Sequence, residues 1–258
     1  MPVDITDLFS PWFQKQECEL ESVTVMTEKE GGRNQVFERL VTVAADHVVG
    51  LKAIESLGGF PKAANILRNR VPTRKIARSG FLGEILATEY VDQQTEYSVP
   101  VRRLRHRDTR EQAMRGDDVL GFRTDRSRVK VIKVEAKSRA NLTTAAIVEA
   151  REGLANYKGR PNPETLGFLD CILREQGRDD EAEPITKLQK QSIRTSDVCH
   201  LLFTLSGNNP TSFLEDNSDP VSKGMEFRLC GCRVNAHVDL VRSVFDECLA
   251  RGESDGDA

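Results

Sequence analysis

Two β-branched segments that follow each other closely constrain the fold of this chain more than any other feature. Val131, Ile132 and Val134 make residues 129–137 typical of a largely buried strand, and residues 118–124 predict a strand just before it. The earlier strand opens at Asp118, and the later one ends in Glu135 and Lys137. Successive strand residues point to opposite faces, so Glu135 and Lys137 project from the same face. A charged pair at the end of a buried strand needs a reason, and the sequence therefore predicts a functional site there.

The residue types fit the hydrolysis of a phosphodiester bond. That reaction uses a divalent cation to polarise the phosphoryl oxygen and to lower the pKa of an attacking water. Mg²⁺ prefers oxygen ligands, with Mn²⁺ as a possible substitute. We therefore predict that Glu84, Asp118 and Glu135 bind the metal, with Glu84 reaching in from a preceding helix. Lys137 would position or activate the water, or offset charge that develops on the phosphate. Asp117 stays open as an alternative ligand.

Simpler interpretations compete for each of these residues. Glu135 and Lys137 could be an exposed ion pair on a solvated strand face, which would contribute little. Asp117 and Asp118 follow Gly116 and could belong only to a turn. Glu84 could be an ordinary glutamate on a helix surface.

A segment rich in arginine, residues 102–115, leads directly to Asp118. Such a segment suits a polyanionic substrate, because phosphate contacts supply affinity that does not depend on base sequence. We therefore expect Arg103, Arg105 and Arg107 to contact nucleic acid. The alternative is a solvated arginine-rich hairpin.

Composition excludes few classes of protein. Charged residues make up 30% of 258 residues, the net charge is −3, and no run of 18 apolar residues occurs. The first residues lack the basic and apolar regions of a signal peptide, so we expect a cytoplasmic protein without a membrane span.

The six cysteines are scattered, mostly in apolar stretches, and we expect them to be reduced. A zinc site is an alternative, although its Cys-x-Cys spacing is unusual; its members would be Cys199, His200, Cys230, Cys232 and His237.

Three units are expected along the chain: an N-terminal accessory region at 1–72, a catalytic domain at 73–250 and a disordered acidic tail at 251–258. The N-terminal region predicts strands at 23–26 and 36–44 and helices at 49–57 and 60–67. The catalytic domain predicts an α/β fold of helix, three strands, helix and strand, at 74–91, 96–104, 118–124, 129–137, 142–157 and 198–205. A helical insertion (163–175 and 184–193), a polar loop that follows residues 206–210 and runs to 224, a strand (226–234) and a helix (237–249) complete it. Asp125-Arg126-Ser127 would form the hairpin turn, and Gly83 would allow close packing of its helix against the sheet.

These motifs resemble those of the PD-(D/E)xK nuclease superfamily. The pieces Gly80-Phe81-Leu82-Gly83-Glu84, Gly116-Asp117-Asp118-Val119-Leu120-Gly121-Phe122 and Val134-Glu135-Ala136-Lys137 are most similar to the HamA family, the nuclease subunits of the bacterial Hachiman antiviral system.

The resemblance implies a restriction-endonuclease-like αβββαβ core with a mixed central sheet. It also implies Mg²⁺-dependent, non-specific DNA degradation and control by a partner helicase, HamB. Two alternatives stay open. One is a restriction or repair endonuclease subunit with another targeting partner. The other is a non-catalytic nucleic-acid-binding or assembly subunit that keeps the fold.

Overall fold

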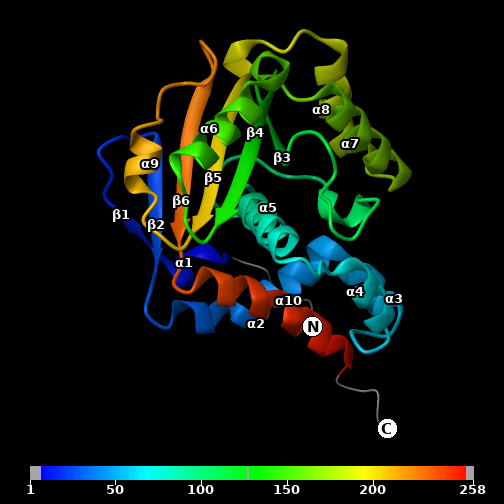
Figure 1. Cartoon of the computed structure of the whole chain (residues 1–258). Coiled ribbons are helices and arrows are strands. Elements are labelled where there is room, and N and C mark those ends of the chain that lie inside the picture. The colour runs from blue at the N-terminus through cyan, green and yellow to red at the C-terminus, as the bar shows by residue number, and fades with distance from the viewer. Residues whose placement is uncertain (1–6, 127, 254–258) are drawn as a thin grey trace.

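A mixed six-stranded sheet forms the centre of the molecule (Figure 1). The computed structural model describes residues 7–126 and 128–253. The strand order is β1-β2-β6-β5-β4-β3. The four central strands pair in parallel, whereas β1 and β3 pair antiparallel at the two edges. The strands are β1 Phe13–Gln16, β2 Val23–Glu28, β3 Val119–Asp125, β4 Arg128–Arg139, β5 Val198–Ser206 and β6 Glu226–Arg233.

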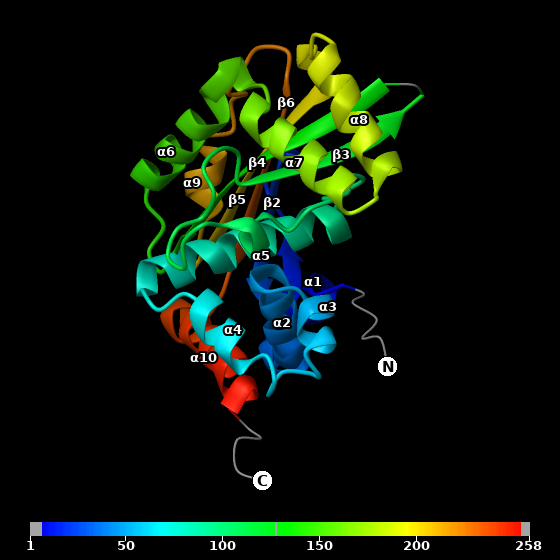
Figure 2. The same ribbon diagram turned by 90° about the vertical axis from the view of Figure 1, so that its right-hand side faces the viewer.

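Helices cover both faces of this sheet. Figure 2 shows α5 lying between the sheet and a group formed by α2, α4 and α10. The α-helices are α1 Phe9–Trp12, α2 Gly32–Val48, α3 Leu51–Ser56, α4 Ala64–Arg70, α5 Lys75–Gln94, α6 Thr144–Ala155, α7 Pro163–Glu175, α8 Asp179–Lys190, α9 Thr211–Glu215 and α10 His237–Glu253. Three 3₁₀ turns are η1 Arg103–His106, η2 Asn156–Gly159 and η3 Thr195–Asp197. No helix in the described ranges is both long and apolar enough to cross a bilayer.

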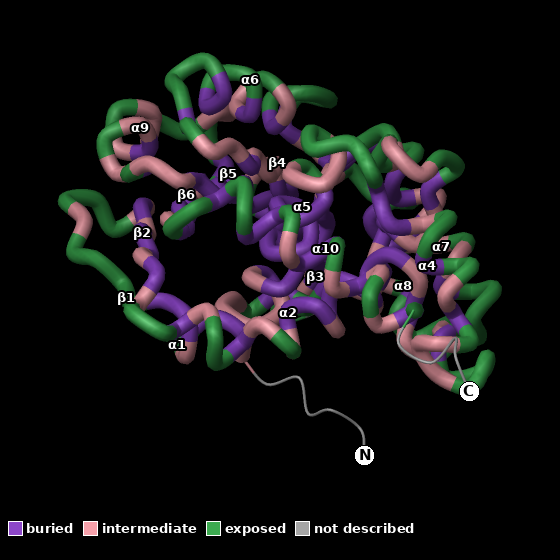
Figure 3. Tube along the Cα trace, turned by 60° about the horizontal axis from the view of Figure 1, so that its bottom comes forward, coloured by how far each residue is buried: buried purple, intermediate pink, exposed green. Residues whose placement is uncertain are grey.

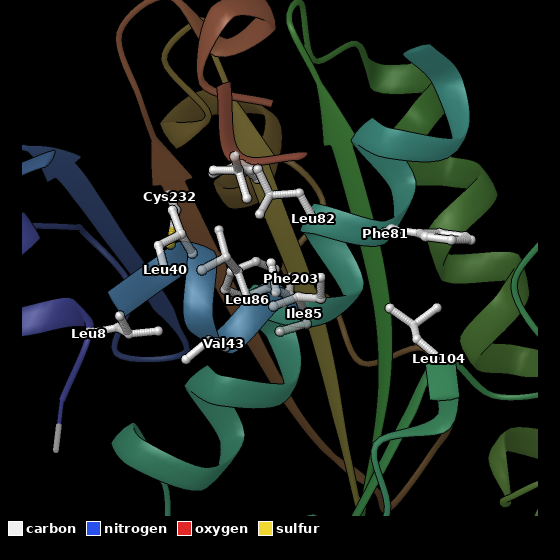
Figure 4. Packing of buried hydrophobic residues seen from close by; sticks show 14 of the residues in the cluster. Leu8, Leu40, Val43, Phe81, Leu82, Ile85, Leu86, Leu104, Phe203 and Cys232 are labelled. Atoms are coloured by element: carbon white, nitrogen blue, oxygen red, sulfur yellow. The ribbon is translucent and has the colours of Figure 1, made fainter. Parts of the chain in front are cut away.

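The main core lies between the sheet and α5. Leu82, Ile85 and Leu86 of α5 pack with Leu40 of α2 and Phe203 of β5 (Figure 4). All nine residues of β5 are buried, and in Figure 3 the buried part of the trace follows the central strands and α5. The helix at 74–91 and the strand at 198–205 are thereby confirmed.

Glycine at position 83 brings α5 unusually close to β4. A Cβ atom placed there would lie 2.9 Å from the Cβ of Ser138. The predicted close packing of Gly83 against the sheet is therefore confirmed, and it sets the distance between Glu84 and the strand that carries Glu135.

Two smaller clusters cover the opposite face. One joins α6 and α9 to the sheet through residues that include Ile147, Leu154 and Leu202. The other joins α7 and α8 to the β3–β4 hairpin through residues that include Leu169 and Val131. The predicted helical insertion is confirmed, although α8 begins earlier than expected, at Asp179. The polar loop after β5 also contains a short helix, α9.

The strand predicted at 36–44 is wrong, because these residues lie within α2. Val36, Leu40, Val43 and Ala44 are all buried, and their spacing of about four residues places them on one helix face. The β-branched content of the segment misled the prediction, since intrinsic propensity is weak beside tertiary packing.

The strand predicted at 96–104 is also wrong. Only Ser98 pairs with the sheet, through an isolated bridge to Phe122, and η1 begins at Arg103. The Val99 N–H donates a hydrogen bond to the Asp92 carboxylate (2.6 Å) and not to a neighbouring strand. Pro100 has no N–H that could donate to a strand. The structure thus has the mixed α/β sheet that was expected, without the first strand of the predicted αβββαβ core.

The division into an accessory region and a catalytic domain stays a prediction. Within the described residues, β1 and β2 belong to the same sheet as the later strands, and α2 shares the main core with α5. Residues 251–253 end α10, so the predicted disordered tail begins too early. Ser127 of the predicted turn, the first six residues and residues 254–258 lie outside the described residues.

Candidate active site

A cleft of about 250 Å³ contains all four residues predicted to form the site. Glu84 of α5, Asp118 just before β3, and Glu135 and Lys137 of β4 line it. The hairpin register explains part of this arrangement: Val119 pairs with Val134, so Asp118 stands opposite Glu135 across the two strands. Glu84 comes from the helix that Gly83 brings against β4.

Asp118, and not Asp117, faces the cleft. Asp118 Oδ2 accepts a hydrogen bond from the Ala136 N–H (2.9 Å), which ties its carboxylate to the strand that carries Glu135. Asp117 instead accepts from the Asn162 N–H (2.7 Å) and pairs with the buried ammonium of Lys133 (3.3 Å). The two neighbouring aspartates therefore have different roles, and Asp117 connects the hairpin to the start of α7.

Lys137 is held between two carboxylates. Its Nζ donates to Glu135 Oε1 (3.0 Å) and to Glu149 Oε1 of α6 (3.2 Å). The side chains of Lys137 and Glu135 are only 11% and 16% exposed. The solvated-pair interpretation therefore does not describe them, because that interpretation needs both side chains in water.

The carboxylates of the cleft raise each other's pKa. Burial and the nearby charge of Asp118 raise the pKa of Glu84 to about 8 and that of Glu135 to about 7. Burial also raises the pKa of Asp118, although the Ala136 N–H opposes this shift. Acidic groups that are buried or partly buried together, and whose ionised forms are disfavoured there, are electrostatically suited to a bound cation.

Two neighbours of the site on α6 were not predicted from the sequence. Glu149 contacts Lys137, and a Cβ atom at Gly153 would lie 2.7 Å from Glu135 Oε2. The glycine thus leaves room for the Glu135 carboxylate beneath the helix. The sequence could have indicated that these two residues lie together, because Glu149 and Gly153 are four positions apart in the predicted helix at 142–157 and therefore share one face.

The arginine segment is largely built into the protein. Arg103 is 6% exposed and donates to the carbonyls of Arg115 (2.7 Å) and Asp118 (3.4 Å). Arg107 is 2% exposed, donates to backbone carbonyls and stacks over the Phe81 ring at 4.9 Å. Arg105 pairs with Asp46. Contact of these arginines with nucleic acid stays a prediction, but the burial of Arg103 and Arg107 favours a supporting role behind the cleft.

No complete metal site of three or more His, Cys, Asp or Glu side chains is assembled within residues 7–126 and 128–253. The zinc alternative therefore has no support here, and His237 instead bonds Ser138 Oγ through Nε2 (2.9 Å). The acidic cleft offers a partial site. Such a site suits Mg²⁺, which keeps several waters and needs few carboxylates from the protein.

Comparison with known proteins identifies the family to which this chain belongs. A family model described as HamA matches residues 6–248. The chain belongs to the HamA family. Hachiman protein HamA from Bacillus cereus is 30% identical to it over 216 residues, which cover 83% of this chain and 72% of that protein. The four residues that line the cleft all lie within the part that matches the HamA model.

Proposed function

We propose that this HamA family member is a metal-dependent nuclease that hydrolyses DNA phosphodiester bonds in Hachiman anti-phage defence. The observation that carries the proposal is the meeting of Glu84, Asp118, Glu135 and Lys137 in one cleft. Carboxylates that can hold a cation, beside a lysine that can stabilise negative charge, suit metal-assisted phosphodiester hydrolysis. The defence context rests on the family and on the name of the Bacillus cereus relative.

Asp118 and Glu135 would hold Mg²⁺, with Glu84 as a third carboxylate, directly or through water. The fit rests on the donors themselves: all three are oxygen ligands around one cleft, and in addition to burial the nearby charge of Asp118 raises the pKa values of Glu84 and Glu135. When bound, the cation would polarise the phosphoryl oxygen and lower the pKa of the attacking water.

The protein's own groups position and neutralise the reacting atoms. The Ala136 N–H fixes the direction of the Asp118 carboxylate, and Glu149 fixes the Lys137 ammonium beside Glu135. Burial lowers the pKa of Lys137, but the neighbouring carboxylates of Glu135 and Glu149 more than offset this effect, so its pKa is raised and the ammonium stays protonated. The ammonium can therefore donate to the water or to a phosphate oxygen and stabilise the negative charge that develops there.

Cleavage of supercoiled plasmid tests this proposal. The wild-type protein should cut with Mg²⁺ and stop when EDTA removes it. Glu135→Gln and Lys137→Met should each lower the cleavage rate by at least about 100-fold, because each removes a group that acts on the reacting atoms. Glu152→Gln is the matched control, since Glu152 is exposed on the same helix as Glu149 and lies outside the cleft. Full activity of Glu135→Gln, or cutting in EDTA, would contradict the assignment.

We also propose that a partner helicase of the HamB type controls the activity, because a nuclease without sequence specificity needs external restraint. Co-purification from the native operon tests this. If the chain elutes alone and cuts DNA equally fast with and without the neighbouring gene product, the partner proposal is wrong.

A further inference from the structure

A second and larger cavity, of about 690 Å³, adjoins the acidic cleft. It lies between the N-terminal ends of α5 and α10. Ser138 and Arg139, which follow Lys137 at the end of β4, line both cavities. A ligand that leaves the acidic cleft over the end of β4 therefore enters this groove directly.

A chain of buried and partly buried hydrogen bonds fixes the wall between the two cavities. Ser138 Oγ contacts Ser79 Oγ of α5 (3.0 Å) and His237 Nε2 of α10 (2.9 Å). Ser79 Oγ also donates to the Ser138 carbonyl (2.9 Å). Because α5, β4 and α10 are joined at this point, the groove holds a set position relative to Glu84 and Lys137.

The groove exposes apolar side chains that a folded core would normally hide. Ile76 is 83% exposed and Val238 is 54% exposed, and they belong to the two helices on opposite sides of the groove. Val241 and Ala140 continue the apolar surface. An exposed apolar patch of this kind marks a binding site, and nothing within the described residues covers it.

The rim of the groove carries an excess of positive charge. Its charged residues are Lys75, Arg78, Arg139, Arg242 and Asp246. Arg78 is paired with Asp246 (2.6 Å) and Arg242 with Asp239 (2.8 Å). In the described part of the chain, Lys75 and Arg139 have no carboxylate partner. Lys75 also lies in the first turn of α5, where the helix dipole is positive, so an anion beside it would be stabilising.

We propose that this groove holds the nucleic-acid strand that flanks the scissile phosphate. Phosphates would lie at Lys75 and Arg139, and a base would pack between Ile76 and Val238. Grooves that bind single strands combine a cationic track with side chains against which bases pack. Aromatic rings usually fill that second role, and here the exposed aliphatic side chains of Ile76 and Val238 take it. The unpaired cations and the continuity with the acidic cleft favour this occupant over a protein segment. The inference rests on the proposed nuclease function.

Binding of a fluorescein-labelled single-stranded DNA oligonucleotide, followed by anisotropy in EDTA over a range of salt concentrations, tests the groove. Lys75→Gln/Arg139→Gln should reduce the slope of log K against log salt by about 1.4, or about 0.7 for each lost phosphate contact. The same slope change corresponds to a fall in affinity of about 25-fold at 0.1 M salt relative to 1 M salt. Lys52→Gln/Lys62→Gln is the matched control, because it removes the same charge from exposed lysines outside both cavities.

A second variant, Ile76→Asp, places a negative charge on a side chain that is already exposed, so its folding should be unaffected. It should weaken binding at least as much as the double variant. Wild-type protein that neither binds nor cuts DNA would overturn the nuclease proposal itself. If wild-type protein binds DNA and the variants show an unchanged slope of log K against log salt, the groove proposal is wrong but the nuclease proposal stands. Normal DNA binding in variants that no longer co-purify with the neighbouring helicase would assign the groove to protein docking instead.

Discussion

Replacing Gly153 with alanine should damage the active site without weakening the fold. Gly153 lies in α6, directly over the carboxylate of Glu135. The added methyl group meets the far end of a flexible side chain and no backbone atom. We therefore expect the Glu135 carboxylate to move, and the helix to stay in place.

The size of the movement follows from the contact distance. The new Cβ would lie 2.7 Å from Glu135 Oε2, and ordinary van der Waals contact begins at 3.4 Å. The difference of these values, 0.7 Å, is the least distance by which the oxygen must withdraw. A misplacement of about 1 Å can lower an enzymatic rate about 100-fold, so we expect a loss of between about 10-fold and 100-fold. The same change should raise the free energy of unfolding by up to about 1 kcal/mol, because alanine favours the helix over glycine.

Plasmid cleavage with Mg²⁺, combined with thermal unfolding, separates the two effects. Gly167→Ala is the matched control, because Gly167 lies within α7 and a Cβ atom there would meet no atom within 4 Å. It should gain similar stability and keep full activity. If Gly153→Ala keeps full activity, Glu135 does not need its present position for catalysis. If the variant loses activity only in parallel with its melting temperature, the argument from contact distance is wrong.

Two further predictions concern stability. Lys133→Met should lower the free energy of unfolding in urea by about 3–5 kcal/mol, because it leaves the buried Asp117 carboxylate without its cation; a loss below about 1 kcal/mol would show that Asp117 does not depend on the pair. For Glu89, burial raises the pKa, but the hydrogen bond from His47 and the charge of Arg102 outweigh it and hold the pKa at about 2. Its stabilisation is therefore present above its ordinary value of 4.5 and disappears as the pH falls towards about 2. Glu89→Gln should flatten the acid limb of melting temperature against pH, and a limb of unchanged steepness would count against this linkage.

The sequence predicted the β3–β4 hairpin well because both of its strands are specified locally. Val131, Ile132 and Val134 specify one largely buried strand, and few residues separate it from the preceding strand, which favours pairing of the two. Once the hairpin is fixed, Asp118 must stand opposite Glu135. The helix at 74–91 needed only its own periodicity, and Gly83 indicated which part of that helix meets the sheet.

The missed features depend on contacts between distant segments. Residues 96–104 do not form a strand partly because the Asp92 side chain accepts a hydrogen bond from the Val99 N–H. The burial of Arg103 and Arg107 depends on how η1 packs behind Asp118, and charge alone suggested exposure. The space at Gly153 exists only because α6 crosses Glu135 at that residue. Sequence periodicity predicts which side chains share one face of a helix or strand, but it does not predict which other segment of the chain packs against that face.

The parallel pairing of β2 with β6 also has a consequence for biosynthesis. Residues 23–27 find their neighbours only at 229–233, and α2 packs against α10. A ribosome must therefore synthesise residues 229–233 before the sheet can close, and folding must wait for contacts that are remote in sequence. A chain that stops before residue 229 cannot pair β2 with β6 and lacks this closure.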